Sequence, residues 1–249
     1  MKSGKVVSVV PARLGSKRVK LKSLRLLNGK PLIEYILDTL KKTTYLNDVY
    51  INSDSDYLGE IAKRNNVKFY KRRAELATSE SLIDDYLYDF MKSVPCDYLA
   101  VVSPTSPFIS ATELDNAWEY YAKHDIDTLL SCEKIQTHCF FKGEPINFSI
   151  KGKHPRSQDI EPIRALNFAI ILLDTAKYIR NYESNGYGVY TGNLGFYDTE
   201  GYSNIDIDYE EDFIFAEHVA RFMSSGKTFE PSYSDVVSDL ISKNIKTEN

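Results

Sequence analysis

A run of valines near the N-terminus, followed at once by a basic turn, constrains the fold more than any other stretch of this sequence. The β-branched run at 6–10 is typical of a strand buried on both faces, and Pro11, which has no backbone N–H for a ladder, ends it. A glycine-containing turn follows, with Arg13, Lys17 and Lys22 among its cations. Such a turn can direct backbone N–H groups toward a ligand, and its charge suits a polyphosphate. A solvated basic loop is the alternative, since a basic turn alone is weak evidence.

The rest of the chain alternates short apolar runs with helical patterns, which favours an α/β fold. Further strands are expected at 49–51, 67–70, 98–102, 128–131 and 165–172, and helices at 32–40, 57–65, 81–91, from 112, 175–181 and 210–223. Ser110 and Glu113 have the spacing of a capping box at the start of the fourth helix. This order predicts one domain over 1–249, with a mainly parallel sheet covered by helices on both faces.

The alternating pattern is interrupted at about 133–164. This stretch contains several glycines and prolines, the aromatic residues Phe140, Phe141 and Phe148, and no long periodic run. We interpret it as a β-rich excursion that covers a ligand crevice or joins a second subunit.

Three polar segments are expected at one edge of the sheet. Segments 11–22, 52–54 and 103–107 each follow a predicted strand directly. In open parallel sheets, ligands bind in the crevice beyond the carboxyl ends of the strands. The convergence of the three segments therefore predicts a binding site there.

Composition excludes several classes of protein. With a net charge of −4 and 43% hydrophobic residues, the chain is typical of a globular protein and unsuited to binding nucleic acid through overall charge. No apolar run approaches the ~20 residues of a membrane span, and no apolar leader is evident. Cys96, Cys132 and Cys139 lack disulfide or zinc spacing. We expect reduced thiols in a cytoplasmic protein without membrane or nucleic-acid partners.

Asp206 and Asp208 form the most specific acidic feature. In an extended segment, residues two apart point to the same side, so both carboxylates can face one Mg²⁺ ion. Alternatively, Asp208 caps the helix that follows it.

Two basic clusters could either bind a ligand or simply be solvated. Arg72 and Arg73 could reach a phosphate or a base, but charge runs are usually solvated. Arg156 and Arg164 could bind a carboxylate or a phosphate, or lie in a solvated loop. The four histidines have no metal or catalytic spacing.

Taken in order, these motifs resemble the CMP-sugar synthetases, a cytidylyltransferase family, in the branch that activates sialic-acid-like nonulosonates. The resemblance extends from about residue 6 to 220. It rests on Ala12-Arg13-Leu14-Gly15-Ser16-Lys17 with Lys22, Asn28-Gly29-Lys30-Pro31-Leu32-Ile33, Ile51-Asn52-Ser53-Asp54-Ser55, Arg72 with Ala74-Glu75-Leu76-Ala77, Pro104-Thr105-Ser106-Pro107, Arg156-Ser157-Gln158-Asp159, Asn167, and Asp206-Ile207-Asp208 with Glu210-Glu211-Asp212.

The resemblance implies a Rossmann-like nucleotidyltransferase fold and transfer of CMP from CTP to the anomeric hydroxyl of a 2-keto-3-deoxy acid sugar. It also implies a homodimer that exchanges the excursion. The implied roles are catalytic for Arg13, Lys17, Lys22 and Asp208; nucleotide-binding for Ala12, Arg13, Gly15, Ser16, Lys22, Arg72 and Ala77; sugar-binding for Ser103, Thr105, Ser106, Gln158 and Asn167; and Mg²⁺-binding for Asp206 and Asp208.

Three positions depart from the family pattern. Lys20-Leu21-Lys22-Ser23 stands where the family has Pro-Gly-Lys-Asn, so the lysine is kept but the turn is not expected. Ser103 stands in place of a glutamine, and Ser79 lies where an aspartate is usual. Transfer to an octulosonate or a sugar 1-phosphate, and a non-catalytic nucleotide-binding homologue, remain alternatives.

Overall fold

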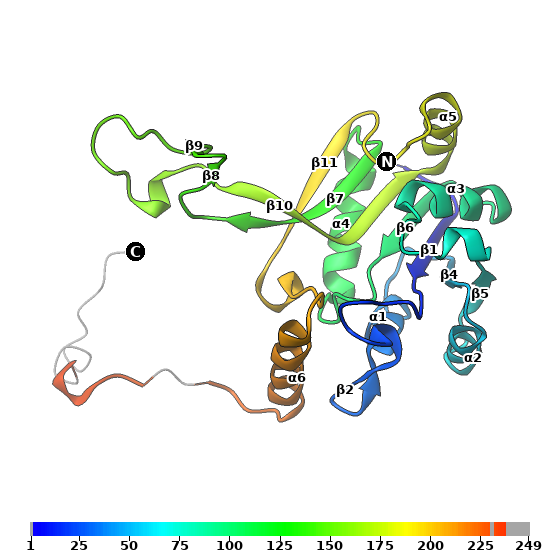
Figure 1. The fold of residues 1–249 in the computed structure, drawn as a ribbon, viewed down its shortest axis with the longest axis horizontal. Helices are drawn as coiled ribbons and strands as arrows, with labels where there is room; N and C mark the ends of the chain where they lie inside the picture. The colour runs from blue at the N-terminus through cyan, green and yellow to red at the C-terminus, as the bar shows by residue number, and fades with distance from the viewer. Residues whose placement is uncertain (1, 230–231, 238–249) are drawn as a thin grey trace.

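The structure is a computed structural model, in which residues 2–229 and 232–237 are described (Figure 1). The predicted domain of 1–249 therefore extends past the described residues at both ends. A central sheet has the strand order β11-β7-β10-β6-β1-β4-β5. Its strands are β1 Val6–Pro11, β4 Asp48–Ser53, β5 Lys68–Lys71, β6 Tyr98–Val102, β7 Thr128–Ile135, β10 Ile163–Asp174 and β11 Leu194–Thr199.

The sheet is mainly parallel, as predicted, with one reversed strand. β1 pairs in parallel with β4 and β6, and the β4–β5 and β7–β11 pairs are also parallel. β10 runs antiparallel to both β6 and β7. The reversal follows from the excursion, which returns the chain to the sheet from the opposite end.

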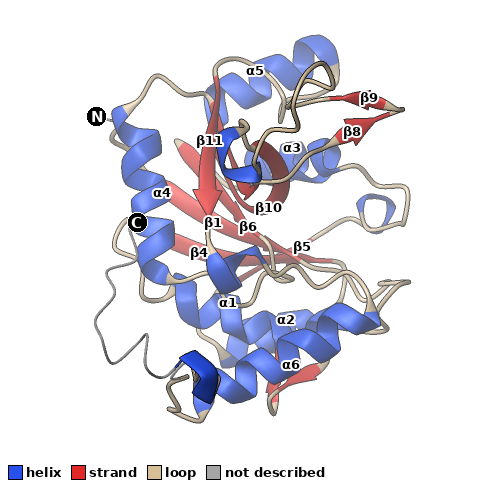
Figure 2. Ribbon diagram, turned by 90° about the vertical axis from the view of Figure 1, so that its left-hand side faces the viewer, coloured by secondary structure: helices blue, strands red, loops and turns tan. Residues whose placement is uncertain are grey.

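Helices cover both faces of the sheet, which confirms the predicted layers (Figure 2). One core cluster packs side chains of α1, α2 and α4 against the sheet, and a second packs α3 and α5 against its other face. The helices are α1 Leu32–Leu40, α2 Asp56–Arg64, α3 Ile83–Ser93, α4 Ala111–Lys123, α5 Thr175–Asn185 and α6 Glu210–Ser224. The Ser110–Glu113 capping box is present at the start of α4.

A small hairpin connects β1 to α1. β2 Leu26–Leu27 pairs antiparallel with β3 Lys30–Pro31 across Asn28 and Gly29, both of which have a positive φ. These angles suit a two-residue hairpin turn. The hairpin and α6 share a third apolar cluster, which joins the C-terminal helix to the N-terminal turn.

The excursion forms an arm that projects from the body of the protein (Figure 1). β7 and β10 extend into its base, where Ile135 pairs with Ile163. Farther out, β8 Phe140–Phe141 and β9 Glu144–Pro145 form a short hairpin. Phe140 and Phe141 are 57% and 64% exposed, so the arm carries apolar surface that this subunit does not bury.

Two expectations from composition can be compared with the structure. Cys96, Cys132 and Cys139 are all free thiols. Within residues 2–229 and 232–237, each helix is too short or too polar to cross a bilayer.

Asp198 on β11 is the centre of an ionic cluster at the base of the arm. Its carboxylate accepts hydrogen bonds from Arg164 (2.8 Å) and Cys132 (3.2 Å) and pairs with Lys134 (2.6 Å). Burial disfavours the ionised carboxyl, but these partners outweigh burial and hold the pKa of Asp198 well below its usual range. Arg164, a candidate for ligand binding in the sequence, is therefore occupied by Asp198.

We expect Asp198→Asn to lower the free energy of unfolding at pH 7 by about 1–2 kcal/mol, because hydrogen bonds to a charged group are lost. A carboxylate with a depressed pKa stabilises the fold above its unfolded pKa near 4, and the contribution disappears as the pH falls through the lower folded value. Urea unfolding at pH 7 and pH 3 should therefore show a smaller difference between variant and wild type at pH 3. An equal difference at both values would contradict the ionic role.

Candidate active site

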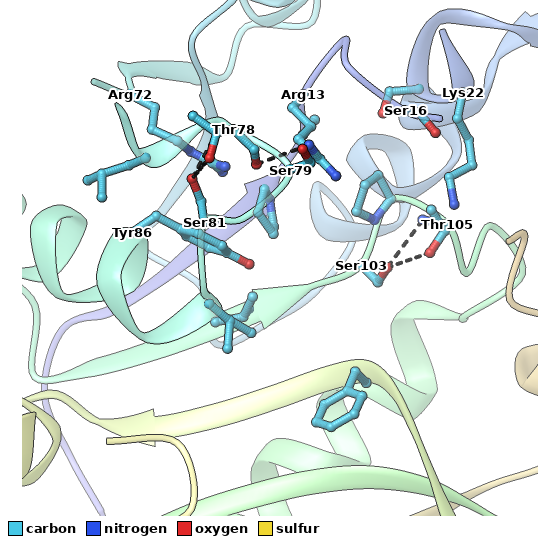
Figure 3. A pocket seen from close by; sticks show the side chains of 18 of the residues that line it. Arg13, Ser16, Lys22, Arg72, Thr78, Ser79, Ser81, Tyr86, Ser103 and Thr105 are labelled. Carbon is cyan, nitrogen blue, oxygen red and sulfur yellow. Dashed lines mark hydrogen bonds between the residues drawn. The ribbon is translucent and has the colours of Figure 1, made fainter. Parts of the chain in front are cut away.

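A cavity of about 560 Å³ opens at the carboxyl ends of β1 and β6 (Figure 3). Two of the three predicted segments, 11–22 and 103–107, contribute to its lining. The third lies behind the cavity, where Asn52 is fully buried and its carbonyl accepts a hydrogen bond from the Ala12 N–H (3.1 Å). The predicted convergence at one sheet edge is therefore confirmed.

The basic turn forms one side of the cavity. Ala12, Arg13, Ser16, Lys17 and Lys22 all line it, whereas the exposed Gly15 does not. Arg13 Nη1 donates to the carbonyl oxygen of Thr78 (3.0 Å), which ties the turn to the loop before α3.

A turn precedes Lys22 although no glycine is present there. Leu21 adopts a left-handed conformation with φ 53° and ψ 34°, just before the short 3₁₀ helix Lys22–Leu24. A non-glycine residue pays a steric cost there, which local contacts must offset. Lys22 supplies some of them, since its ammonium donates to the Ile207 carbonyl and to Asp208 Oδ1 (3.2 Å).

Arg72 is a buried cation in the cavity wall. It is 5% exposed, and its guanidinium donates to the Asn52 side chain (2.7 Å) and the Asn52 carbonyl (2.9 Å). The guanidinium carbon lies 4.2 Å from the centre of the Tyr86 ring. Burial lowers the pKa of Arg72 and raises that of Tyr86 to about 12. No salt bridge to Arg72 is found in the described part of the chain, so its charge is available to a ligand.

The Ala77 backbone, which was predicted to bind the nucleotide, does not lie directly at the cavity. Ala77 itself is not in the cavity lining, although its neighbours Leu76 and Thr78 are. The Ala77 N–H donates to the Ala74 carbonyl (3.0 Å) and so closes a 3₁₀ turn.

Asp206 and Asp208 flank Ile207, which is fully buried. Thr105 Oγ1 donates to Asp206, and Asp208 accepts from Arg18 (2.9 Å) and Lys22 (3.2 Å). Burial, with a contribution from Asp208, raises the pKa of Asp206.

The alternative that Asp208 caps α6 is wrong. Tyr209 is the N-cap residue, and the Asp212 carboxylate accepts from the N–H groups of Asp208 (2.9 Å) and Tyr209 (2.7 Å). Asp212 therefore does the capping. The Asp208 side chain pairs with Arg18 and Lys22, which line the cavity, whereas Asp206 and Asp208 are not themselves in its lining.

The acidic pair fits a magnesium ion. Among the described residues, no group of three or more His, Cys, Asp and Glu side chains could hold a metal. Mg²⁺ needs few protein ligands, because it keeps water and takes phosphate oxygens to complete its shell. Two carboxylates beside a cationic turn match that donor set, so Asp206 and Asp208 are the residues that would hold the ion.

The predicted sugar-side residues separate into two groups. Ser103 and Thr105 line the cavity, and their hydroxyl oxygens lie 2.8 Å apart. Ser106, Gln158 and Asn167 do not line it. Ser106 is 1% exposed, and Gln158 lies on the arm in the turn Ser157–Asp159, beside an ion pair of Arg156 with Asp159.

Asn167 makes its hydrogen bonds beneath the cavity. Its amide oxygen accepts from Ser131 Oγ (2.6 Å) and the Ala169 N–H (3.2 Å), and its amide nitrogen donates to Thr199 Oγ1 (2.8 Å). Both polar atoms of the side chain are thus used within the protein.

Several residues that line the cavity were not among the site residues predicted from the sequence. Thr78, Ser79 and Ser81 add hydroxyl-bearing residues beside Arg13, and Tyr86 and Phe168 add aromatic rings. Tyr86 lies in the apolar stripe of α3, so its periodicity indicated only core packing. The proximity of Tyr86 to Arg72 arises from tertiary packing, for which the sequence holds no local signal.

Comparison with known proteins identifies the family of the chain. The family model described as cytidylyltransferase matches residues 7–216. The chain belongs to the cytidylyltransferase family. Its match covers the basic turn, Arg72, the Ser103–Thr105 segment and the acidic pair, and stops within α6.

Curated relatives are similar over most of the chain. An N-acylneuraminate cytidylyltransferase of Streptococcus agalactiae serotype III is 26% identical over 96% of this chain and 60% of its own length. That of Escherichia coli O18:K1:H7 is 29% identical over 73% of this chain and 41% of its own. The chain thus spans about 60% of the first of these relatives.

A solved structure supports the fold. A CMP:2-keto-3-deoxy-manno-octonic acid synthetase in complex with CTP superposes with a TM-score of 0.69 at 15% identity, covering 88% of this chain and 99% of that one. At this identity the likeness concerns the fold, which is that of an α/β nucleotidyltransferase.

Proposed function

We propose that this cytidylyltransferase-family protein transfers CMP from CTP to the anomeric hydroxyl of a 2-keto-3-deoxy acid sugar and releases pyrophosphate. The observation that carries the proposal is the contact between the acidic pair and the cations that line the cavity, since Asp208 pairs with Arg18 and Lys22. Lys22 joins them, since it lines the cavity and contacts Asp208. The names of the relatives support the choice of CTP and an acid sugar.

Each residue's position at the cavity indicates its proposed role. Arg13, Ser16, Lys17 and Lys22 would bind the triphosphate and stabilise the negative charge of the departing pyrophosphate, which is the main task in phosphoryl-type transfer. Arg72 would face the cytidine, and Ser103 and Thr105 would orient the sugar. In-line attack by the sugar hydroxyl on the α-phosphorus is then a matter of positioning.

Asp206 and Asp208 would hold Mg²⁺. The bound ion supplies charge neutralisation on phosphate oxygens and makes a nearby hydroxyl easier to deprotonate. Thr105, which donates to Asp206, would keep that carboxylate oriented.

We further propose a cytoplasmic homodimer. The exposed phenylalanines of the arm supply the apolar surface that a second subunit would cover. Gln158 lies on the arm, outside the cavity of its own subunit, and would reach a sugar only if the arms are exchanged between subunits. Light scattering at micromolar concentration should give twice the mass of one chain, and a monomer would contradict the proposal.

The reaction is tested by pyrophosphate release from CTP and Mg²⁺ with a panel of sugars. The panel contains N-acetylneuraminate, legionaminate, pseudaminate, 3-deoxy-manno-octulosonate and a sugar 1-phosphate. Release with an acid sugar that a chelator abolishes would support the proposal. Release only with the sugar 1-phosphate would favour a related transferase, and a CTP-induced rise in melting temperature without any release would favour a non-catalytic homologue.

Arg72→Lys is expected to raise the KM for CTP about tenfold, because a lysine cannot make both donations to Asn52 and leaves the amide oxygen unpaired. Initial rates at varied CTP measure this, with Arg73→Lys as the matched control. Arg73 is adjacent but 60% exposed and paired with Glu75 and Asp89. An equal change in KM for both variants would contradict the assigned role of Arg72.

A further inference from the structure

Arg18 is a cation of the basic turn to which the proposed reaction assigns no task. It lines the cavity, and its Nη2 donates to Asp208 Oδ1 (2.9 Å). The same carboxylate oxygen accepts from Lys22 Nζ (3.2 Å). One of the two carboxylates that would hold the magnesium ion is therefore paired with two positive charges of the protein itself.

The two cations on Asp208 differ in how firmly they are held. The Lys22 side chain is 13% exposed and also donates to the Ile207 carbonyl, so it is fixed at two points. The Arg18 side chain is 52% exposed, and its guanidinium carbon lies 5.1 Å from the centre of the exposed Tyr209 ring. Exposed ion pairs are weak, and exposed side chains change rotamer quickly. Arg18 can therefore leave Asp208 at little cost, whereas Lys22 cannot.

Arg18 and a divalent ion compete for Asp208. An ion that binds this carboxylate comes within a few ångströms of the guanidinium, and like charges at such distances repel each other. Asp206 is not subject to the same competition, because it accepts its hydrogen bond from the neutral hydroxyl of Thr105. Arg18 therefore weakens ion binding at the acidic pair through Asp208.

A polyphosphate in the cavity would remove this competition. Arg18 lines the cavity together with Ser16 and Lys17 of the same turn. A guanidinium can bind a phosphate through two parallel hydrogen bonds, which is stronger than its single donation to one carboxylate oxygen. A triphosphate would thus draw Arg18 away and leave Asp208 accessible to the ion.

We propose that Arg18 is a counter-ion gate, which blocks divalent ions at Asp208 until the triphosphate of the nucleotide binds and draws the guanidinium away. This inference rests on the proposed function and deepens it, because it makes ion binding at the acidic pair depend on the nucleotide. Free Mg²⁺ binds the pair weakly, and the ion enters together with CTP. Since coupling between two ligands is reciprocal, the ion also strengthens the binding of CTP.

Binding of Mn²⁺, which prefers the same oxygen ligands as Mg²⁺, to the nucleotide-free protein tests the gate. We expect Arg18→Met to bind Mn²⁺ about three- to tenfold more tightly than wild type, because an exposed ion pair and a repelling charge are removed. The EPR signal of free Mn²⁺ measures this without any turnover. An unchanged affinity would overturn the inference.

Arg25→Met is the matched control. Arg25 belongs to the same segment and carries the same charge, but it pairs with Glu210 (2.5 Å) instead of Asp208. Its removal should leave the Mn²⁺ affinity within twofold of wild type. An equal gain in both variants would overturn the gate, because general electrostatic repulsion would then explain the effect.

A double variant locates the effect. In Arg18→Met combined with Asp208→Asn, the gain in Mn²⁺ affinity should disappear, because the gate acts on that carboxylate. A gain that persists without the Asp208 carboxylate would place the ion elsewhere and overturn the inference.

CTP binding in the presence of a chelator tests whether the nucleotide draws Arg18 away. Isothermal titration calorimetry should show that Arg18→Met binds CTP about tenfold more weakly than wild type, because charge-assisted hydrogen bonds to phosphate are lost. Arg25→Met should bind CTP as wild type does. Wild-type affinity for CTP in Arg18→Met would overturn the exchange.

These measurements need no acceptor sugar, so the two proposals can fail separately. Unchanged Mn²⁺ and CTP affinities in Arg18→Met, with normal pyrophosphate release by the wild type, would overturn the gate alone. The expected affinities without pyrophosphate release from any sugar would support the gate and overturn the transfer reaction.

Discussion

Asp208→Asn is expected to reduce Mg²⁺-dependent pyrophosphate release by about 10²–10³-fold, the usual effect of removing one group that stabilises transition-state charge. The substitution is nearly isosteric and takes away one of only two carboxylates that would hold the ion. It also frees Arg18 and Lys22, which contact Asp208. Binding of the negatively charged CTP should therefore survive or strengthen while turnover falls.

Initial rates at several Mg²⁺ concentrations, together with the CTP-induced shift in melting temperature, separate these two effects. Glu211→Gln is the matched control, since Glu211 is exposed in the first turn of α6. Wild-type turnover in Asp208→Asn would exclude the carboxylate from the metal site.

Lys22→Met should have a comparable effect of about 10²–10³-fold on kcat/KM, because in the proposed mechanism this cation binds the triphosphate. The lysine side chain is only 13% exposed, and methionine retains its apolar stem, so packing is largely kept. The melting temperature with CTP should rise less than in wild type.

Lys20→Met provides the comparison for charge alone. Lys20 is exposed in the same turn and does not line the cavity. If both variants lost activity equally, general electrostatic attraction would explain the effect and no specific role would remain for Lys22.

The strand and helix layers of the fold were predictable because local patterns of apolar residues indicate them. The β-branched run of β1 and the apolar stripes of α1 and α3 reflect burial that any arrangement of the sheet would require. The direction of β10 was not predictable, because a strand buried on both faces has the same pattern in either orientation. Its reversal depends on the length and path of the arm.

Predicted site residues line the cavity where they follow strands directly. Most of the basic turn and Thr105 lie together because strand ends meet at one edge of the sheet. Asn167 shows the limit, since its position in β10 was right but its amide hydrogen-bonds to Ser131 and Thr199 beneath the cavity. Phe168 carried no signal, because neither the register shift of β10 around it nor its left-handed φ of 51° can be anticipated from a run of apolar residues.

The place of β1 between β4 and β6 also determines the order in which the chain can fold during synthesis. Val7 pairs with Asp48 on one side, while on the other Val6 pairs with Tyr98, 92 positions later in the chain. At roughly 5–20 residues per second, translation leaves the valine run without its second neighbour for several seconds. Pairing over such a separation is slow, and the unpaired apolar edge is prone to aggregation. We therefore expect nascent chains that end before β6 to require chaperone protection. Chains that extend beyond β6 should be released from the chaperone.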